Sequence, residues 1–478
     1  MSSTAVTRPG RIITVLAAAG IVAALMQTLI LPLVAELPTL LHTDPSNASW
    51  AITITLLTGA IATPVIGRLG DMHGKRRMLL VCVVPLVIGS VCCALADGLP
   101  LMVVGRAMQG MAMGMVPLGI SAMRDLLPAD RLDASIALMS SSMGIGGALG
   151  LPLSAAVAEN ASWHALFWGT AVTSGLVGIL IWRLLPESPP AEPTRFDYPG
   201  AVGLAIGLAC LLLAVTKGAQ WGWTGPVTLS LFGAAVVVLA GWGAWELRTT
   251  DPLVDLRVTA RRRVLLTNAA SVVVGFAMYA QMLIAPQLLQ LPAATGFGLG
   301  QSMLAAGLWM LPSGFMMMAM SPLGARISRA FGPKVTLLIG ASVLATGYGT
   351  SLFLMSSTWG VLVFVSLGNA GVGLAYGAMP ALIMSAVPQT ETAAANGFNT
   401  LMRSIGTSLS AAVIGVVLAQ MTSRVDGLLL PTETGFRTGL ALGGAVALVA
   451  VAVIVTIPGR TRRTEPARPA ALDMAMAR

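Results

Sequence analysis

Charged side chains are scarce in this chain of 478 residues: 10% are Asp, Glu, Lys or Arg, whereas 56% are hydrophobic. A soluble domain carries about 25% charged residues, because its surface faces water. The composition therefore excludes an ordinary soluble protein. It also excludes an intrinsically disordered chain, which combines low hydrophobicity with high charge. The mean hydropathy of +0.83 indicates an all-α polytopic membrane protein.

Cysteine, histidine and lysine are also rare. The four cysteines lie inside apolar runs and the three histidines are scattered, so we expect no disulfide framework and no metal site. None of the three lysines belongs to a GxxxxGK(S/T) phosphate loop, which excludes an ATPase site of that type on this chain. We expect neither enzymatic activity nor a cofactor.

Apolar runs long enough to cross a bilayer, which takes about 20 residues in a helix, recur fourteen times. They cover residues 12–35, 49–69, 78–96, 99–123, 134–157, 164–184, 198–218, 225–246, 264–288, 300–322, 334–355, 358–384, 393–419 and 436–458. The segment after them, 459–478, is rich in Arg, Pro and Ala, and we expect it to be a disordered cytoplasmic tail.

Basic residues are distributed unevenly between the two sides of the predicted membrane. If both termini are cytoplasmic, the inner segments hold 23 Lys and Arg residues and the outer segments hold 3. The positive-inside rule therefore predicts cytoplasmic termini in a plasma membrane. Because this orientation signal accounts for the net charge of +9, we expect the lipid bilayer as a partner and no nucleic acid.

The segment between the second and third runs, residues 67–77, reads GRLGDMHGKRR. Its glycines allow the backbone to turn tightly, and Asp71 stands beside a cluster of bases. A degraded copy, ARISRAFGPK at 325–334, follows at an offset of 258 residues. Two copies suggest parallel halves, which we expect at 1–184 and 263–458, with two inserted helices and their linkers in 185–262.

The segment 67–77 resembles the signature GxLaDrxGrk of the major facilitator superfamily. Two further motifs resemble its fourteen-span drug:proton antiporter branch, the EmrB/QacA-like multidrug exporters. They are RAMQG at 106–110, similar to RxxQG, and GGALGLP at 146–152, similar to GxxxGP. The stretch DPLVDLR at 251–257 also resembles this branch. The resemblance implies a major facilitator fold of two six-helix bundles plus two inserted helices.

The resemblance also implies roles for individual residues. A conformational switch would hold the cytoplasmic side in one access state, formed by Gly67, Asp71, Gly74, Lys75 and Arg76. The antiporter-motif helix would bend at Gly146, Gly150 and Pro152. The chain departs from the branch at Ala23, where the family has an aspartate, and at Leu151, which separates the motif's last glycine from its proline.

Acidic residues are missing from the middle of the apolar runs. Charges inside a membrane are costly and are functional candidates by default, and here they are Arg106 and Arg403. The resemblance implies a coupling role for Arg106. Glu36, near Pro32 at the outer end of the first run, is the best carboxylate for carrying a proton. Each residue keeps a structural alternative: either arginine could bind backbone carbonyls, and Glu36 could be a solvated charge at a helix end.

Polar and aromatic side chains deep in the runs are expected to line a substrate cavity. They are Gln27, Gln109, Tyr279, Gln281, Trp309, Asn369, Tyr376 and Asn399. Methionines in the fourth and tenth runs would add a soft apolar surface, which suits promiscuous ligands.

These features predict a monomeric bacterial secondary transporter that exports hydrophobic or cationic small molecules, such as drugs and antibiotics, by proton antiport with alternating access. The proton gradient would take the place of a cofactor. The first alternative is an exporter of a specific metabolite or self-made antibiotic with another coupling mode, because the interior acid is missing. The second is a non-transporting membrane receptor or scaffold, which would need neither paired halves nor the turn around Asp71.

Overall fold

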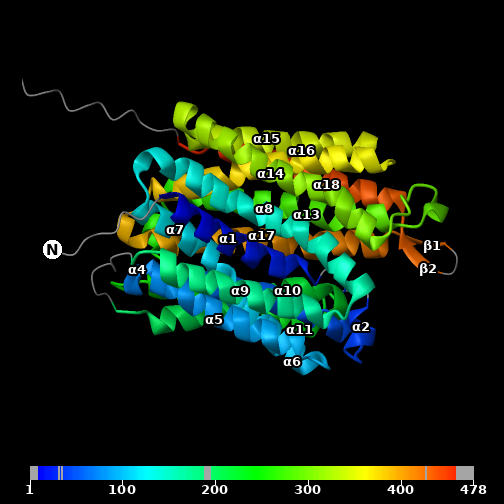
Figure 1. The fold of residues 1–478 in the computed structure, drawn as a ribbon, viewed down its shortest axis with the longest axis horizontal. Helices are drawn as coiled ribbons and strands as arrows, with labels where there is room; N and C mark the ends of the chain where they lie inside the picture. The colour runs from blue at the N-terminus through cyan, green and yellow to red at the C-terminus, as the bar shows by residue number, and fades with distance from the viewer. Residues whose placement is uncertain (1–8, 31–32, 34–35, 188–194, 426–427, 459–478) are drawn as a thin grey trace, which may run out of the picture.

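The chain folds into a bundle of long helices in the computed structural model, which describes residues 9–30, 33, 36–187, 195–425 and 428–458 (Figure 1). Within these residues, 14 helices are long and apolar enough to cross a membrane, which confirms the predicted number. They are α1 (Pro9–Thr28), α4 (Trp50–His73), α5 (Lys75–Ala94), α6 and α7 (Leu99–Met111 and Met115–Leu126, one span), α8 (Ala129–Asn160), α9 (His164–Leu184), α10 (Tyr198–Trp221), α11 (Pro226–Glu246), α13 (Arg262–Gln290), α14 (Met303–Phe331), α15 (Pro333–Leu354), α16 (Thr358–Met384), α17 (Thr392–Gln420) and α18 (Glu433–Val455).

Short elements connect these helices. They are α2 (Leu37–Leu40), α3 (Pro45–Ala48), α12 (Leu256–Thr259), three 3₁₀ turns (Ala112–Gly114, Ala293–Thr295 and Gln389–Glu391) and two strands, β1 (Thr422–Val425) and β2 (Leu428–Pro431). The strands pair antiparallel in a hairpin between α17 and α18. Pro32 and the predicted disordered tail, 459–478, lie outside the described residues.

The two helices that lead into the signature turns extend beyond their apolar runs. α4 continues to His73 and α14 to Phe331, past the predicted ends at 69 and 322, because the backbone hydrogen bonds of a helix do not depend on apolar side chains. Each helix then stops at a glycine with positive φ, 90° at Gly74 and 88° at Gly332, a conformation that other residues rarely adopt. Most of the charged signature is therefore helical, and the turn itself is one residue in both copies.

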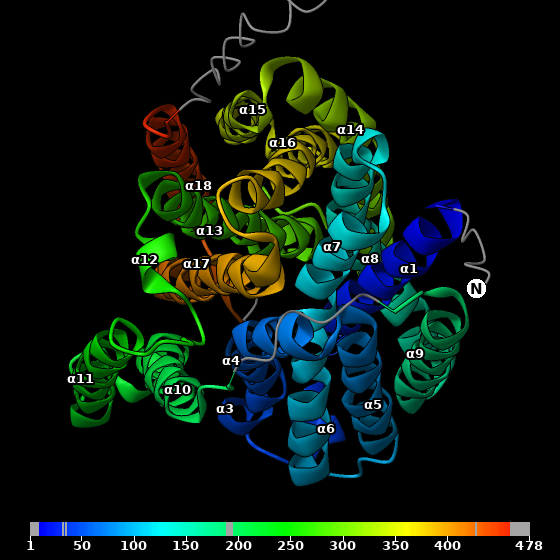
Figure 2. The same cartoon turned by 90° about the vertical axis from the view of Figure 1, so that its left-hand side faces the viewer.

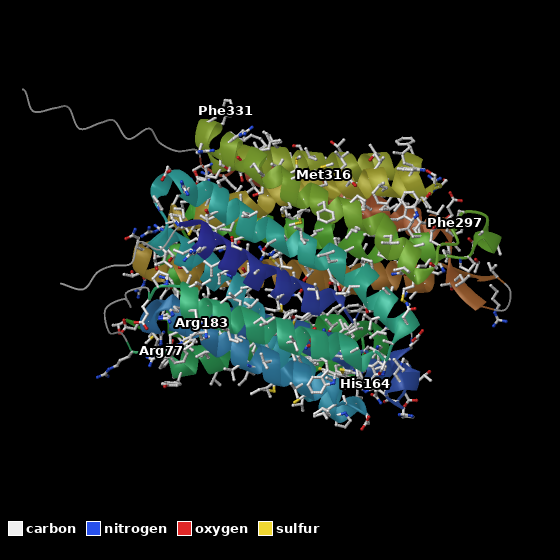
Figure 3. The ribbon with its side chains drawn as sticks, in the orientation of Figure 1. Arg77, His164, Arg183, Phe297, Met316 and Phe331 are labelled. Atoms are coloured by element: carbon white, nitrogen blue, oxygen red, sulfur yellow. The ribbon has the colours of Figure 1, made fainter. Side chains whose placement is uncertain are left out.

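These glycine turns mark one end of the bundle, which we call the turn end, and the β-hairpin marks the other, which we call the hairpin end. Figure 3 shows Arg77, Arg183 and Phe331 at the turn end, and His164 and Phe297 at the hairpin end. Figure 2 looks at the molecule from the turn end, where α4 and α7 lie close to α17.

The inserted helices α10 and α11 lie at the side of the bundle (Figure 2). α10 packs Leu204 and Leu208 into a hydrophobic cluster with Leu57 of α4 and Leu401 of α17, so it contacts both halves. Its buried Lys217 donates a hydrogen bond to Ser49 Oγ at 2.5 Å. α11 packs mainly on α10 and exposes apolar side chains on its outer face, which suits contact with lipid.

Glycines of α8 let this helix pack closely between α1 and α14. Gly146 lies against the Ile21 carbonyl of α1, and a Cβ atom on Gly314 of α14 would lie 2.7 Å from the Gly144 oxygen. Near the other end of the contact, a Cβ on Gly307 would lie 2.8 Å from the Pro152 nitrogen. Small residues at such contacts allow helices to approach in a membrane, where packing rather than hydrophobicity drives their association.

The α8–α14 contact generates a prediction. Gly314→Leu should destabilise the protein by about 1–3 kcal/mol, because the added side chain overpacks a closed interface, and should lower the unfolding midpoint in detergent. Gly349→Leu is the matched control, because nothing lies within 4 Å of a Cβ atom at that position. Equal midpoints for the two variants would show that α8 and α14 do not need this close approach.

Candidate functional site

A buried carboxylate joins α4 to α17 at the turn end. Asp71 is 2% exposed and accepts hydrogen bonds from the backbone N–H groups of Ala393 (3.2 Å) and Ala394 (2.9 Å). The first N–H groups of a helix have no partner within the helix and carry its positive dipole end. Asp71 supplies both the acceptor and the opposite charge. We call this contact the Asp71 latch.

Other contacts support the latch from both sides. Lys75 Nζ lies 3.5 Å from Asp71 and 2.5 Å from Asp125 of α7. Ser121 of α7 shares a hydrogen bond of 2.6 Å with Thr392, the first residue of α17. Gly67 is needed for the approach, because a Cβ atom there would lie 2.5 Å from the Ala393 oxygen. The turn end is therefore closed by α4, α7 and α17.

Arg76 has a different position from the other residues of the predicted switch. Its guanidinium donates to the Trp182 carbonyl at 2.5 Å and to Glu187 at 3.1 Å. It therefore ties the start of α5 to the end of α9, and within the described residues it forms no hydrogen bond or ion pair with the latch.

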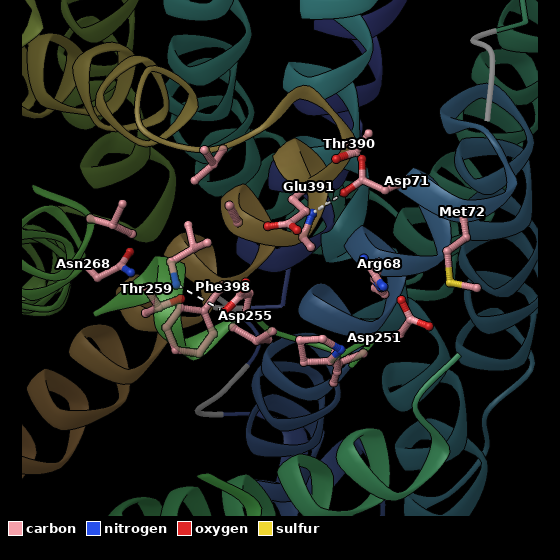
Figure 4. Close-up of a pocket in the computed structure, with 18 of the residues that line it drawn as sticks. Arg68, Asp71, Met72, Asp251, Asp255, Thr259, Asn268, Thr390, Glu391 and Phe398 are labelled. Atoms are coloured by element: carbon pink, nitrogen blue, oxygen red, sulfur yellow. Dashed lines mark hydrogen bonds between the residues drawn. The ribbon is translucent and has the colours of Figure 1, made fainter. Parts of the chain in front are cut away.

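A pocket lies beside the latch, lined by the end of α4, the loop around α12, the start of α13, the loop after α16 and the start of α17 (Figure 4). Arg68 is 8% exposed, and its Nε has no hydrogen-bond partner among the described residues. The acids Asp251, Asp255 and Glu391 also line this pocket. Asp255 caps α12 through the N–H groups of Arg257 and Val258. The linker that follows α11 thus reaches the pocket beside the latch. The sequence pattern did not predict this arrangement.

A second hollow lies deeper, between the two halves. It has two adjoining lobes of about 110 and 140 Å³, both lined by Gln27, Met143, Met278 and Tyr376. These four side chains come from α1, α8, α13 and α16. We call the two lobes together the central cavity. Seven of the predicted site residues line it: Gln27, Arg106, Tyr279, Gln281, Asn369, Tyr376 and Arg403.

Arg106 is held by backbone carbonyls. Its Nε donates to the Ala51 oxygen of α4 at 2.9 Å, and its Nη1 donates to the Met26 oxygen of α1 at 3.0 Å and to Gln109 at 2.7 Å. The residue is 1% exposed. Arg106 therefore cross-links three helices at the edge of the cavity. Carbonyl dipoles compensate its charge, and none of the ion pairs among the described residues involves it.

Arg403 has fewer partners. Its only hydrogen bond to a described residue is a long one, 3.4 Å to Thr400, and its guanidinium lies 4.5 Å from the centre of the Tyr376 ring. A guanidinium has five N–H donors, so most of them have no acceptor among the residues that the structure describes. The stacking on Tyr376 fixes the orientation of the group while its donors stay available to the cavity.

Four predicted site residues lie away from the described cavity linings or at their margin. Gln109 is fully buried between Arg106 and Ser90, and Asn399 bonds to Asn268 and Ser271 of α13. Trp309 stacks edge-on with Trp359 at 5.0 Å, on the outer side of α14 and α16. Glu36 is exposed before α2. Depth along a helix was predictable from the sequence, but the direction in which each side chain points was not.

The central cavity carries positive charge. Every Asp and Glu in the spanning helices lies within five residues of a helix end, and none lines either lobe. Two unit charges about 5 Å apart interact by about 3 kcal/mol at an effective dielectric constant of about 20. A cation near Arg403 would therefore be disfavoured by an energy of this order, and an anion favoured by a similar one.

Comparisons with known proteins agree on one family. A model of the Major Facilitator Superfamily matches residues 16–411. The tetracenomycin C resistance and export protein of Streptomyces glaucescens is 27% identical over 434 residues, which cover 88% of this chain and 78% of that protein. The multidrug resistance protein Stp of Mycobacterium tuberculosis is 28% identical over 378 residues, 78% of this chain and 69% of Stp. The structure of the proton:xylose symporter XylE matches with a TM-score of 0.65 at 14% identity, covering 94% of this chain and 96% of XylE, and shows the fold alone.

The latch predicts a measurable change in hydrogen exchange. In Asp71→Asn the acceptor loses its charge, which weakens a charge-assisted bond by roughly 1–2 kcal/mol, so the amides of Ala393 and Ala394 should exchange about 10-fold faster. Asp130→Asn is the control, because Asp130 is an exposed acid in the first turn of α8. Unchanged exchange at the start of α17 would contradict a latch that depends on the Asp71 charge.

Proposed function

Because the chain belongs to the Major Facilitator Superfamily, and is a multi-pass membrane transporter rather than an enzyme, we propose that it exports antibiotic-like small molecules from a bacterial cell by alternating access. The observation that carries this proposal is the central cavity between the two halves, closed toward the turn end by the Asp71 latch. Relatives named for tetracenomycin export and multidrug resistance support the class of cargo.

We place the turn end in the cytoplasm of the cell and the protein in its plasma membrane. The positive-inside rule supports this orientation, because the bases of both signature copies lie at the turn end (Figure 3). The bacterial source of the relatives supports the membrane. In this orientation the latch closes the cytoplasmic side, and export requires it to open so that cargo enters from the cytoplasm.

The latch is suited to a reversible switch. It joins one carboxylate to two N–H groups that would otherwise lack partners, so it can break and re-form without unfolding either helix. Separation of α17 from α4 would expose Asp71 and Lys75 to water, which replaces the lost hydrogen bonds. The Asp71–Lys75–Asp125 cluster then offers acids that move between buried and wet surroundings, which is where we place proton exchange if the transporter uses it.

Coupling to protons is the finer part of this proposal. The resemblance to the antiporter branch supports it, while the acid-free lining of the central cavity favours the alternative of a specific cargo with another coupling mode. No observation on the described residues favours a receptor or scaffold role.

Transport into proteoliposomes or out of cells tests the proposed function. In an efflux-deficient bacterium, the wild-type protein should lower the accumulation of tetracenomycin-type or other antibiotics. Asp71→Asn should lower the export rate at least about 10-fold, since its weakened latch closes the cytoplasmic side less often, whereas Asp130→Asn should keep the wild-type rate. Export that is equal in wild type, Asp71→Asn and empty-vector cells would overturn the proposal.

Arg106 generates a separate prediction about coupling. Arg106→Gln removes two of the bonds to carbonyls on α1 and α4, so it should abolish the part of export that follows an imposed pH gradient while leaving downhill exchange. The unfolding midpoint, measured in parallel, shows whether the variant still folds. Full pH-driven flux in a folded Arg106→Gln protein would remove Arg106 from the coupling mechanism.

A further inference from the structure

Arg403 lies in an unusual position for a charged side chain. It is on α17, about one-third of the way along a spanning helix, and it lines the first lobe of the central cavity. It is 8% exposed, and none of the ion pairs among the described residues involves it. A charged group in the interior normally has a counter-charge or a set of hydrogen-bond acceptors. Arg106 in the same lobe has such acceptors, whereas the described residues offer Arg403 only Thr400 and the face of Tyr376.

The walls around Arg403 are apolar, soft and partly aromatic. Tyr279 and Tyr376 belong to the same lobe, and methionines line both lobes: Met113, Met143, Met278, Met282, Met310 and Met317. Methionine adapts its shape and makes favourable contacts with aromatic rings. Polar groups at the far side of the second lobe are uncharged, such as Asn369, which donates to Ser313 at 2.9 Å.

From this arrangement we propose that the central cavity binds an aromatic organic anion, with Arg403 as the residue that pairs with its charge. The ring system would pack against the methionine-lined walls, and the anionic group would accept the guanidinium hydrogen bonds that no described residue accepts. The proposal rests on the proposed export function for its physiological meaning, but the binding site itself is defined by the cavity and by Arg403. It excludes cations from the preferred cargo.

A series of probes with one ring system and three charges tests the proposal. The probes are 2-naphthalenesulfonate (anionic), 2-naphthalenemethanol (neutral) and 2-naphthylmethylammonium (cationic), titrated into the full-length protein in nanodiscs. We expect the sulfonate to bind about 100-fold more tightly than the ammonium, with the alcohol between them. Equal affinities, or tighter binding of the ammonium, would overturn the proposal.

Variants of Arg403 show whether this residue sets the preference. Arg403→Gln should weaken sulfonate binding at least about 10-fold and leave the alcohol unchanged, and Arg403→Lys should keep part of the preference. Binding of the alcohol reports that each variant is folded. Arg326→Gln, which removes an exposed arginine at the end of α14, controls for the change in net charge. If Arg403→Gln weakens all three probes equally, its role is packing and the proposal fails.

Transport separates this inference from the proposed function. Sulfonate that binds through Arg403 but is not moved across proteoliposome membranes would support the anion site and contradict export. Movement of all three probes at equal rates would support export and contradict the anion preference.

Discussion

The cost of a charge without a partner in a medium without water is the constraint on which the rest of this structure depends. A buried ionic group needs a partner from the protein or from a ligand, and the protein partners differ in kind. Asp71 uses the free N–H groups at the start of α17, Arg106 uses carbonyls of α1 and α4, and Lys217 uses Ser49 beside the ring of Trp50. Each of these charges consequently fixes one helix against another, so that a few polar groups set the arrangement of helices whose surfaces are otherwise apolar.

The contacts between the helices divide into permanent and reversible ones. Glycine contacts between α8 and its neighbours leave no room for a side chain, and bonds from Arg106 to carbonyls have no competing partner in the membrane. The Asp71 latch instead lies at the end of the bundle, where water can replace it at small cost. A transporter needs both kinds, because its halves must stay rigid while one contact between them opens. The linker around α12 reaches the pocket next to the latch, which gives the inserted helices a physical connection to that opening.

The sequence predicted the fold better than the site. Fourteen spans follow from the length of apolar runs, and the signature around Asp71 identifies the turn that ends at Gly74. The partner of Asp71 was not predictable, because Ala393 and Ala394 contribute backbone N–H groups from 322 residues further along the chain, and no side-chain type marks them. Trp309 and Gln109 are absent from the two described lobes for another reason: rotation about the helix axis, which a single sequence does not give, decides whether a side chain meets Trp359, Ser90 or the cavity.

If the cargo is an anion, one explanation covers two features of the cavity. Its lining contains no acid, and most N–H donors of Arg403 have no acceptor among the described residues. Ala23, which stands where the antiporter branch has an aspartate, lines the same lobe as Arg403, so this cavity lacks a negative charge and carries a positive one instead. A membrane potential of about 100 mV is worth about 2.3 kcal/mol per elementary charge. An inside-negative potential drives an anion outward and holds a cation inside. Export of a cation therefore needs an exchanged proton and an acid to carry it, whereas export of an anion is favoured without a titratable group in the cavity.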